Sequence, residues 1–489
     1  MTRPRVVIVG AGVSGMAAAV ALGDRPWRSP LVDVTVLDER NHHVLAPMLY
    51  GVAAGRARPE IAARPVRSLL HGLPNVAFRQ ARVQSIQPRL RRVETDRGSI
   101  PYDYLVVAAG SVDDHRGLVG PMLGVDDLAQ AVEVRDHVAS CREAAAWASP
   151  AERARLLTIA VVGGGATGLE LAAGLAARGA RGGAGVEVTV VVLEAADPPA
   201  GLPRAMATAV VRSVRERGVR VELGARVTTV DERGVALEND QRIDAGTVIW
   251  AGGVRANPLA EGFAATGAQG RVLVRDTLQT DHYPEIFVVG DMAEPASPTG
   301  ERPQMTGGVA LCAGRHAAAS LRRMASGRAV RPLAEGHGGV IVNVGPREAV
   351  ARVGLLQLTG VPGKLAWLGL DLLPLAGRRS KGLLVAHWAA GAMRPASREQ
   401  VVLGAAGVPR PSPAVEPARE RVDLPSVNVG NADDFGRTAA LSWWTSELPD
   451  QRSELGPPPG SLAAVRAKVL RLRQALFGIK SNTQDDYSR

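Results

Sequence analysis

The sequence predicts an α/β fold built on two parallel sheets, and three observations support this class. The chain has 489 residues, too many for one hydrophobic core. Two segments, beginning near Val6 and Ile159, each show an apolar run, a glycine-rich turn and an Ala-rich stretch. Only 3% of the residues are aromatic, so the interior must rely on Val, Leu and Ala, which suits buried parallel strands.

The first segment has the order strand, turn, helix. The apolar run Val6–Val9 enters a turn whose glycines have the dinucleotide-binding spacing: Gly10, Gly12 and Gly15. The first glycine allows the sharp turn, the second lets the backbone approach a pyrophosphate, and the third lets helix and strand pack closely. A second run, Val32–Leu37, ends in Asp38, where such units place the acid that binds a ribose hydroxyl. The segment therefore predicts a Rossmann-type cofactor site.

The second segment repeats this pattern. After Ile159–Val162 come glycines at the same spacing: Gly163, Gly165 and Gly168. A strand over Val186–Leu193 then ends in Glu194, and the glycine-rich insert Gly179–Gly185 lengthens the connection before it. Because a carboxylate here repels a 2′-phosphate and no arginine follows until Arg204, this site is predicted to prefer NADH over NADPH.

Two dinucleotide sites in one chain favour an oxidoreductase that transfers hydride between a nicotinamide and a second ring cofactor. We find no convincing catalytic triad, metal-binding group or nucleophilic cysteine. The two cysteines, Cys141 and Cys312, are far apart in sequence, which excludes a disulfide framework and suits a reducing compartment. Cys312 follows an apolar run in a predicted helix, so we expect it to be a small buried residue.

The net charge of +10 and the pI near 10.3 predict attraction to an anionic surface. Nucleic acid is disfavoured, because no basic stripe is interleaved with aromatic residues. The N-terminus runs straight into the strand at Val6 and leaves no room for a signal-peptide core. A cytoplasmic location is therefore expected.

Three further segments are apolar runs that enter a glycine-containing turn: Tyr102–Ser111 with Gly110, Asp244–Val254 with Gly253, and Ile286–Asp291 with Gly290. They resemble the chain-crossing and Gly-Asp motifs of the two-dinucleotide-binding flavoprotein reductases. That resemblance implies that the first turn binds FAD and the second NAD(P)H, and that Asp291 contacts the ribityl and phosphate region of the flavin. The alternative for Asp291 is an ordinary turn aspartate.

Within that superfamily, residues 5–395 are similar to the type II NADH dehydrogenases, which are single-subunit NADH:quinone oxidoreductases. The likeness rests on Asp38–Tyr50 and Pro65–Arg67, which resemble the segment beside the flavin, and on Gly163–Glu170, which resembles the NADH turn. It implies FAD and NADH as cofactors, a quinone as electron acceptor and Glu170 as a catalytic residue near the nicotinamide. Alternatively, Glu170 only complements the helix dipole.

Competing functions stay open at this point. Disulfide reductases and sulfide:quinone oxidoreductases are disfavoured, because both need redox cysteines that this chain lacks. The stretch Met305–His316 carries none of the glutamines that type II dehydrogenases place beside the quinone, although Gln304 lies just upstream. The alternatives are a soluble NADH:acceptor reductase with a non-quinone acceptor and a non-enzymatic flavin-bound redox sensor.

The predicted organisation has the NADH domain inserted in the FAD domain. Residues 1–118 and 258–330 form the FAD domain, 152–257 the NADH domain, 331–400 an α+β interface and membrane-docking region, and 401–489 a Pro-rich linker with a basic tail. Short strands are expected within Gly338–Val353. The oligomeric state stays open, with a homodimer as one option.

The C-terminal third predicts peripheral membrane binding. Neither Lys364–Ala376 nor Lys381–Met393 has the ~18 uninterrupted apolar residues of a spanning helix. By resemblance we expect two amphipathic helices that dock on anionic lipid at the inner face of the cell membrane. The alternative is a helical lid over the core. A basic amphipathic helix over Ser461–Lys480 is expected to pack on its own chain.

Overall fold

The computed structural model describes residues 3–24, 29–179, 188–199, 201–296, 303–334, 339–345, 348–353 and 356–372. The chain divides into two units, Met1–Glu416 and Pro417–Arg489, and all described residues lie in the first. The predicted docking helix at Lys381–Met393, the region 401–489 with its basic helix, and most of the insert Gly179–Gly185 lie outside the described residues.

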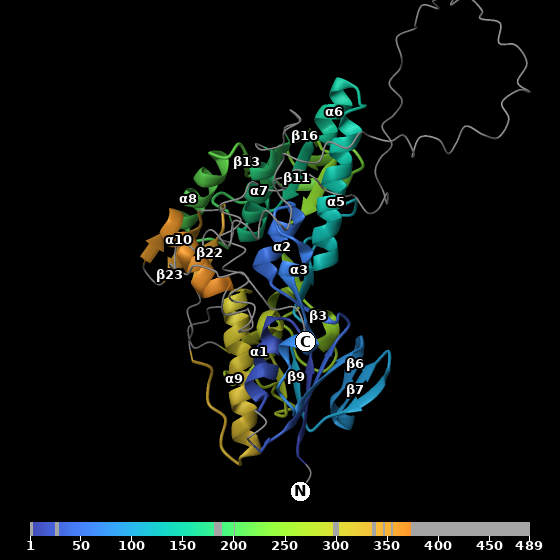
Figure 1. Cartoon of the computed structure of the whole chain (residues 1–489), viewed down its shortest axis with the longest axis vertical. Helices are drawn as coiled ribbons and strands as arrows, with labels where there is room; N and C mark the ends of the chain where they lie inside the picture. The colour runs from blue at the N-terminus through green and yellow to red at the C-terminus, as the bar shows by residue number, and fades with distance from the viewer. Residues whose placement is uncertain are drawn as a thin grey trace, which may run out of the picture. The chain divides into compact units, whose positions relative to one another are not determined.

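A five-stranded parallel sheet carries the first glycine turn. Its strand order is β20 (Ile286–Val288), β9 (Tyr104–Val107), β1 (Arg5–Val9), β2 (Asp33–Asp38) and β5 (Val76–Gln80). Helices α1 (Val13–Leu22) and α9 (Gly307–Ala325) lie side by side in the same hydrophobic cluster (Figure 1). Their contact needs Gly314, because a Cβ there would lie 2.1 Å from the carbonyl oxygen of Ser14.

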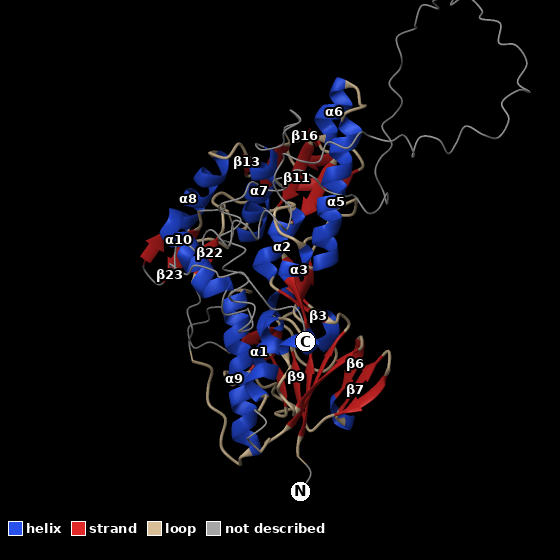
Figure 2. Cartoon of the chain, viewed as in Figure 1, coloured by secondary structure: helices blue, strands red, loops and turns tan. Residues whose placement is uncertain are grey.

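A second parallel sheet carries the second glycine turn. Its four strands have the order β13 (Arg220–Leu223), β12 (Thr189–Glu194), β11 (Thr158–Val162) and β17 (Thr247–Trp250). Figure 2 labels two of them, β11 and β13, in red. The helices packed with it are α5 (Leu128–Ala145), α7 (Ala166–Gly179) and α8 (Arg204–Arg215). Strands β11 and β17 are almost fully apolar, as expected for strands of a parallel sheet that is covered on both faces.

Two antiparallel strands, β10 (Ser111–Asp113) and β18 (Val254–Ala256), pair where the chain passes between the two sheets. Three smaller antiparallel sheets accompany the two parallel ones. The first pairs β3 (His42–Val44) with β4 (Ala63–Pro65). The second contains β6 (Val83–Gln87), β7 (Arg92–Thr95) and β8 (Gly98–Pro101), and the third contains β14 (Val227–Asp231), β15 (Gly234–Leu237) and β16 (Arg242–Asp244). Strands β19 (Val272–Val274) and β21 (Ala293–Pro295) form a parallel pair. The short helices are α2 (Ala46–Ala53), α3 (Pro59–Ala62), α4 (Val66–Leu69) and α6 (Pro150–Leu156).

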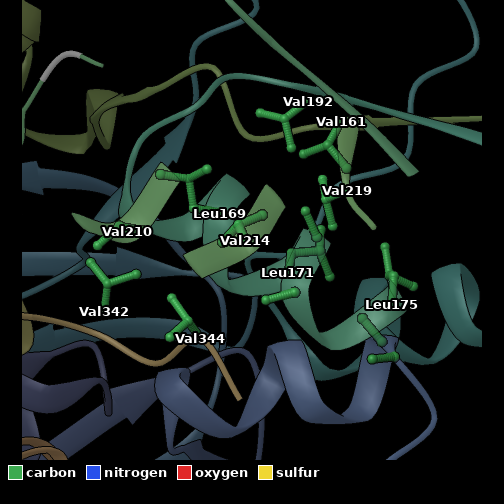
Figure 3. Close-up of a cluster of buried hydrophobic side chains, with 14 of the residues drawn as sticks. Val161, Leu169, Leu171, Leu175, Val192, Val210, Val214, Val219, Val342 and Val344 are labelled. Atoms are coloured by element: carbon green, nitrogen blue, oxygen red, sulfur yellow. The ribbon is translucent and has the colours of Figure 1, made fainter. Parts of the chain in front are cut away.

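The last described segment is a three-stranded antiparallel sheet followed by a helix. Strands β22 (Val340–Val342) and β23 (Val350–Val353) fall within the predicted range, and β24 (Leu356–Leu358) is an additional strand. Figure 3 shows Val342 and Val344 in one buried cluster with Leu171 of α7 and Val214 of α8. Helix α10 (Gly360–Ala366) continues into a π-helical segment, Trp367–Leu372. None of the described helices is long and apolar enough to cross a membrane.

Candidate functional site

The first glycine turn, between β1 and α1, is held by close backbone contacts. A Cβ on Gly10 would lie 2.2 Å from the carbonyl oxygen of Ala108, and Gly10 has a φ of +102°. A Cβ on Gly15 would lie 1.9 Å from the carbonyl oxygen of Gly10. Both contacts are with backbone atoms, which cannot move aside cheaply. The structure therefore explains why larger residues are excluded here.

The second turn, between β11 and α7, repeats this geometry residue for residue. Gly163 has a φ of +110°, and a Cβ there would lie 2.3 Å from the carbonyl oxygen of Ala251. A Cβ on Gly168 would lie 1.9 Å from the carbonyl oxygen of Gly163. The two halves of the chain thus build the same cradle from different sequences.

The middle glycine of each turn faces open space. A Cβ on Gly12 or on Gly165 would meet no atom within 4 Å. Helix α1 begins after Gly12 with no side-chain cap and no acidic residue in its first turn, so its N-terminal N–H groups keep their capacity to bind an anion. This combination of room, unused donors and a helix N-terminus fits the pyrophosphate of a dinucleotide.

The acids at the ends of β2 and β12 hold their turns in matching ways. One carboxylate oxygen of Asp38 accepts a hydrogen bond from Ala11 N at 2.7 Å, and the other accepts one from Arg40 N at 2.8 Å. Glu194 likewise accepts from Gly164 N at 2.6 Å and from Ala196 N at 2.9 Å. Each carboxylate oxygen has a further lone pair. These acids can therefore bind a ribose hydroxyl without releasing the turn.

The Gly290–Asp291 motif lies against the first turn, at the start of α1. Gly290 adopts a φ of +70°, and a Cβ there would lie 2.3 Å from the hydroxyl oxygen of Ser14. The Ser111 hydroxyl donates a hydrogen bond to Asp291 at 2.9 Å. Desolvation raises the pKa of Asp291, while this bond and the Arg271 guanidinium act in the opposite direction. Four segments distant in sequence thus meet at one site.

Gly110 and Gly253 flank the crossing strands β10 and β18. Gly110 has a φ of +72° and its carbonyl oxygen accepts a hydrogen bond from Asn257 N at 3.0 Å. Gly253 has a φ of +131°, and its carbonyl oxygen accepts from Asp114 N at 3.0 Å and from Trp250 Nε1 at 3.1 Å. Both glycines therefore fix the crossing between the two sheets.

Glu170 makes a contact with the C-terminal sheet that the sequence did not predict. It is the fifth residue of α7, beyond the first turn, and its side chain is 8% exposed. Its carboxylate accepts a hydrogen bond from the backbone N–H of Asn343, just after β22. The residue thus connects the helix of the second turn to the C-terminal sheet.

Lys364 on α10 is a residue that the sequence analysis missed as part of this site. Its side chain is 4% exposed, and its Nζ donates to Asn343 Oδ1 at 2.6 Å and to the carbonyl oxygen of Gly345 at 3.2 Å. The ammonium also lies 3.9 Å from the centre of the Trp367 ring. Burial lowers the pKa of Lys364 to about 7, and the nearby Glu170 carboxylate partly offsets this. A single lysine in a helix gives no sequence signal for such burial.

The cysteines differ from one another. Cys141 on α5 is 1% exposed, with its Sγ 3.4 Å from His137 Nε2. The expectation that Cys312 is buried was wrong, because the structure exposes it. The buried row of α9 runs through Ala310, Ala313, Ala317 and Leu321, and Cys312 lies outside it. Among the described residues, no group of three His, Cys, Asp or Glu could hold a metal ion.

This arrangement defines a two-dinucleotide oxidoreductase. A family model for pyridine nucleotide-disulphide oxidoreductases matches residues 4–327, about two thirds of the chain, and the chain belongs to this family. It is 32% identical over 422 residues to the type II NADH:quinone oxidoreductase NdhA of Mycobacterium tuberculosis, covering 79% of this chain and 86% of that relative. More specifically, therefore, it belongs to the type II NADH:quinone oxidoreductases, as predicted.

Two further comparisons agree with this assignment. A type II NADH:quinone oxidoreductase of Staphylococcus haemolyticus is 27% identical over 373 residues, covering 73% of this chain and 92% of that one. The solved structure of NDH2 from Plasmodium falciparum in complex with NADH matches with a TM-score of 0.72 at 15% identity, covering 82% of this chain and 100% of that one. At this identity the structural likeness concerns the fold, and it confirms the predicted α/β class.

Proposed function

We propose that this protein oxidises NADH with a bound FAD and passes the electrons to a membrane quinone. The observation that carries the proposal is the pair of matching glycine cradles, each with an open middle glycine and an acid bonded to its turn. The names of the relatives supply the identity of donor and acceptor.

FAD is assigned to the first cradle, with Gly12 and Asp38 at the adenosine diphosphate and Asp291 beside the rest of the cofactor. The support is that Gly290 lies against Ser14, at the start of the helix that follows this cradle, and that Ser111 bonds to the adjacent Asp291. NADH is assigned to the second cradle, where Glu194 disfavours a 2′-phosphate. By this assignment the FAD domain comprises 1–118 and 258–330, and the NADH domain 152–257.

For hydride transfer, the main task of the protein is then to align the two bound cofactors with one another. FAD, when bound, supplies the ring that accepts hydride from NADH. The chain holds each cofactor by its phosphates and ribose, and the crossing strands β10 and β18 tie the two cradles together. Glu170 and Lys364 both bond to Asn343 and so hold the C-terminal sheet against the helix of the second cradle.

Quinone remains the proposed acceptor although α9 lacks the glutamines of the resembled family. The relatives that cover most of this chain carry quinone in their names. A soluble reductase with another acceptor and a non-enzymatic redox sensor are the other outcomes of the test below.

The test uses the purified full chain. We expect a yellow protein whose flavin absorbance bleaches on anaerobic NADH addition and which turns over rapidly with a short-chain quinone. Turnover with ferricyanide alone would identify a soluble reductase, and bleaching without turnover would identify a sensor. A colourless protein that cannot be reconstituted with FAD would refute all three.

We further propose that the C-terminal sheet and α10 face the cell membrane, on its inner side, where NADH is present. Four apolar side chains of the described sheet and helix are exposed: Val353 at 37%, Leu356 at 69%, Val361 at 57% and Leu365 at 55%. With the positive net charge of +10, they suit an interface with anionic lipid. Pelleting with acidic liposomes should be lost when Val361 and Leu365 are both replaced by Ser, and retained when the exposed Trp147 is replaced by Ser.

A further inference from the structure

Strands β3 and β4 form an antiparallel pair, called the β3–β4 hairpin below although helices α2 and α3 connect its strands, and β4 carries one arginine, Arg64. Its register is fixed by hydrogen bonds from Leu45 N to the carbonyl oxygen of Ala62 at 2.7 Å and from Val66 N to that of Asn41 at 2.9 Å. In this register His43 and Arg64 lie directly opposite one another. Residues directly opposite in an antiparallel pair project from the same face of the sheet. Arg64 therefore shares a face with His43.

That face is turned toward the first cradle. His43 is 3% exposed, and its Nδ1 donates a hydrogen bond at 2.8 Å to the carbonyl oxygen of Ala11, which lies between Gly10 and Gly12. Burial lowers the pKa of His43, which favours the neutral imidazole. The positive group on this face of the hairpin is the Arg64 guanidinium.

Arg64 has a charge that the described residues leave without a partner. Its side chain is half-buried, and its Nε is buried with no hydrogen-bond partner. Within the described ranges it makes no ion pair, whereas Arg40, in the preceding loop, is paired with Asp127 at 2.8 Å. A guanidinium stays charged at any working pH and is well matched to phosphate. An unpaired, partly buried arginine next to a phosphate-binding turn points to an anionic ligand.

We propose that Arg64 binds the diphosphate of the FAD held by the first cradle, which makes it a cofactor-binding residue outside the glycine fingerprint. The helix N-terminus at Gly12 would supply backbone donors to the diphosphate, and Arg64 would supply a cation. The inference rests on the proposed function, because it requires FAD in this cradle.

The experiment measures FAD release from the full-length holoprotein through the fluorescence of the freed flavin. Arg64→Gln should speed release about ten- to a hundredfold, because it removes a charge-assisted contact. Arg64→Lys keeps the charge but loses the planar fork, and should fall between this variant and the unaltered protein. Arg58→Gln is the matched control, since its exposed side chain precedes α3 and makes no ion pair among the described residues.

The salt dependence of FAD release is a second measurement, and it should not change if Arg64 has only a structural role. Release from the unaltered protein should accelerate with KCl concentration, and the slope should be smaller in Arg64→Gln. Folded Arg64→Gln that releases FAD at the unaltered rate would overturn the proposal. Where Arg64→Gln does not fold, the release rate of Arg64→Lys decides: release at the unaltered rate would overturn the proposal, because lysine lacks the planar fork of arginine. A colourless unaltered protein would instead contradict the proposed function, so the two failures are distinguishable.

Discussion

The Glu170 carboxylate on α7 accepts the backbone N–H of Asn343, a residue 173 positions away, and so joins the second cradle to the C-terminal sheet. Glu170→Ala should therefore leave a partly buried N–H without this partner and lower the free energy of unfolding by about 1 kcal/mol. Glu170→Gln keeps an acceptor and should unfold near the unaltered temperature. Thermal unfolding of both variants checks this, and equal losses in the two would contradict an acceptor role.

Glu170→Gln also separates anchoring from chemistry. If the residue also acts on the nicotinamide, this variant should keep its stability and its flavin but slow the anaerobic bleaching by NADH. Stopped-flow absorbance at the flavin band measures that rate. An unchanged rate would assign Glu170 to anchoring alone.

Lys364 should make stability depend on pH in the alkaline range. Burial lowers its folded pKa to about 7, whereas the unfolded side chain titrates near 10.4. Between these values the unfolded chain holds a proton that the folded chain lacks, so raising the pH favours folding. The stability of the unaltered protein relative to Lys364→Met should rise above pH 7, by at most about 1.4 kcal/mol per pH unit, and stay constant below it.

Urea unfolding at pH 6, 7, 8 and 9 gives this comparison. Leu365→Met, at an exposed position on the same helix, serves as the control and should run parallel to the unaltered protein at every pH. If the unfolding free energy of Lys364→Met instead ran parallel to that of the unaltered protein across this pH range, the predicted lowering of the Lys364 pKa would be wrong.

The open middle glycines allow the two cofactors to be separated. Gly12→Ala and Gly165→Ala meet no atom within 4 Å, so both variants should fold, but the added methyl occupies the space of a phosphate. Gly12→Ala should be purified with less FAD. Gly165→Ala should keep its FAD and raise the KM for NADH about tenfold or more. Flavin content and steady-state kinetics measure both, and the reverse pattern would exchange the cofactor assignment.

Glu194 should set the preference between the two nicotinamide coenzymes. Glu194→Gln can still accept the Gly164 N–H, but it no longer repels a 2′-phosphate. The ratio of kcat/KM for NADPH to that for NADH should rise about ten- to a hundredfold, which corresponds to about 1.4–2.8 kcal/mol of relieved repulsion. Asp38→Asn is the matched control at the other cradle. A similar shift in that variant would mean that the preference does not arise at Glu194.

The parts of the fold that the sequence could predict are local ones. The glycine turns, the strands that enter them and the acids that follow lie within short segments, where periodicity and glycine spacing carry the signal. The structure places these residues in two matching cradles, and the comparisons confirm the α/β class and the family.

The contacts that could not be predicted join residues far apart in sequence. The bond from Asn343 to Glu170 and the burial of Lys364 depend on how the C-terminal sheet packs on α7. The pairing of His43 with Arg64 requires the register of a hairpin whose strands have only three residues each. Cys312 was misplaced because a local apolar run does not reveal which face of α9 meets α1.

The bonds from Asp38 and Glu194 to their own turns are made within the chain, so the shape of both cradles does not depend on contacts with a cofactor. A loop that is already ordered loses little conformational freedom when its ligand enters, so more of the contact energy appears as affinity. After its removal, FAD should therefore rebind to this protein without a need for the first cradle to refold around it.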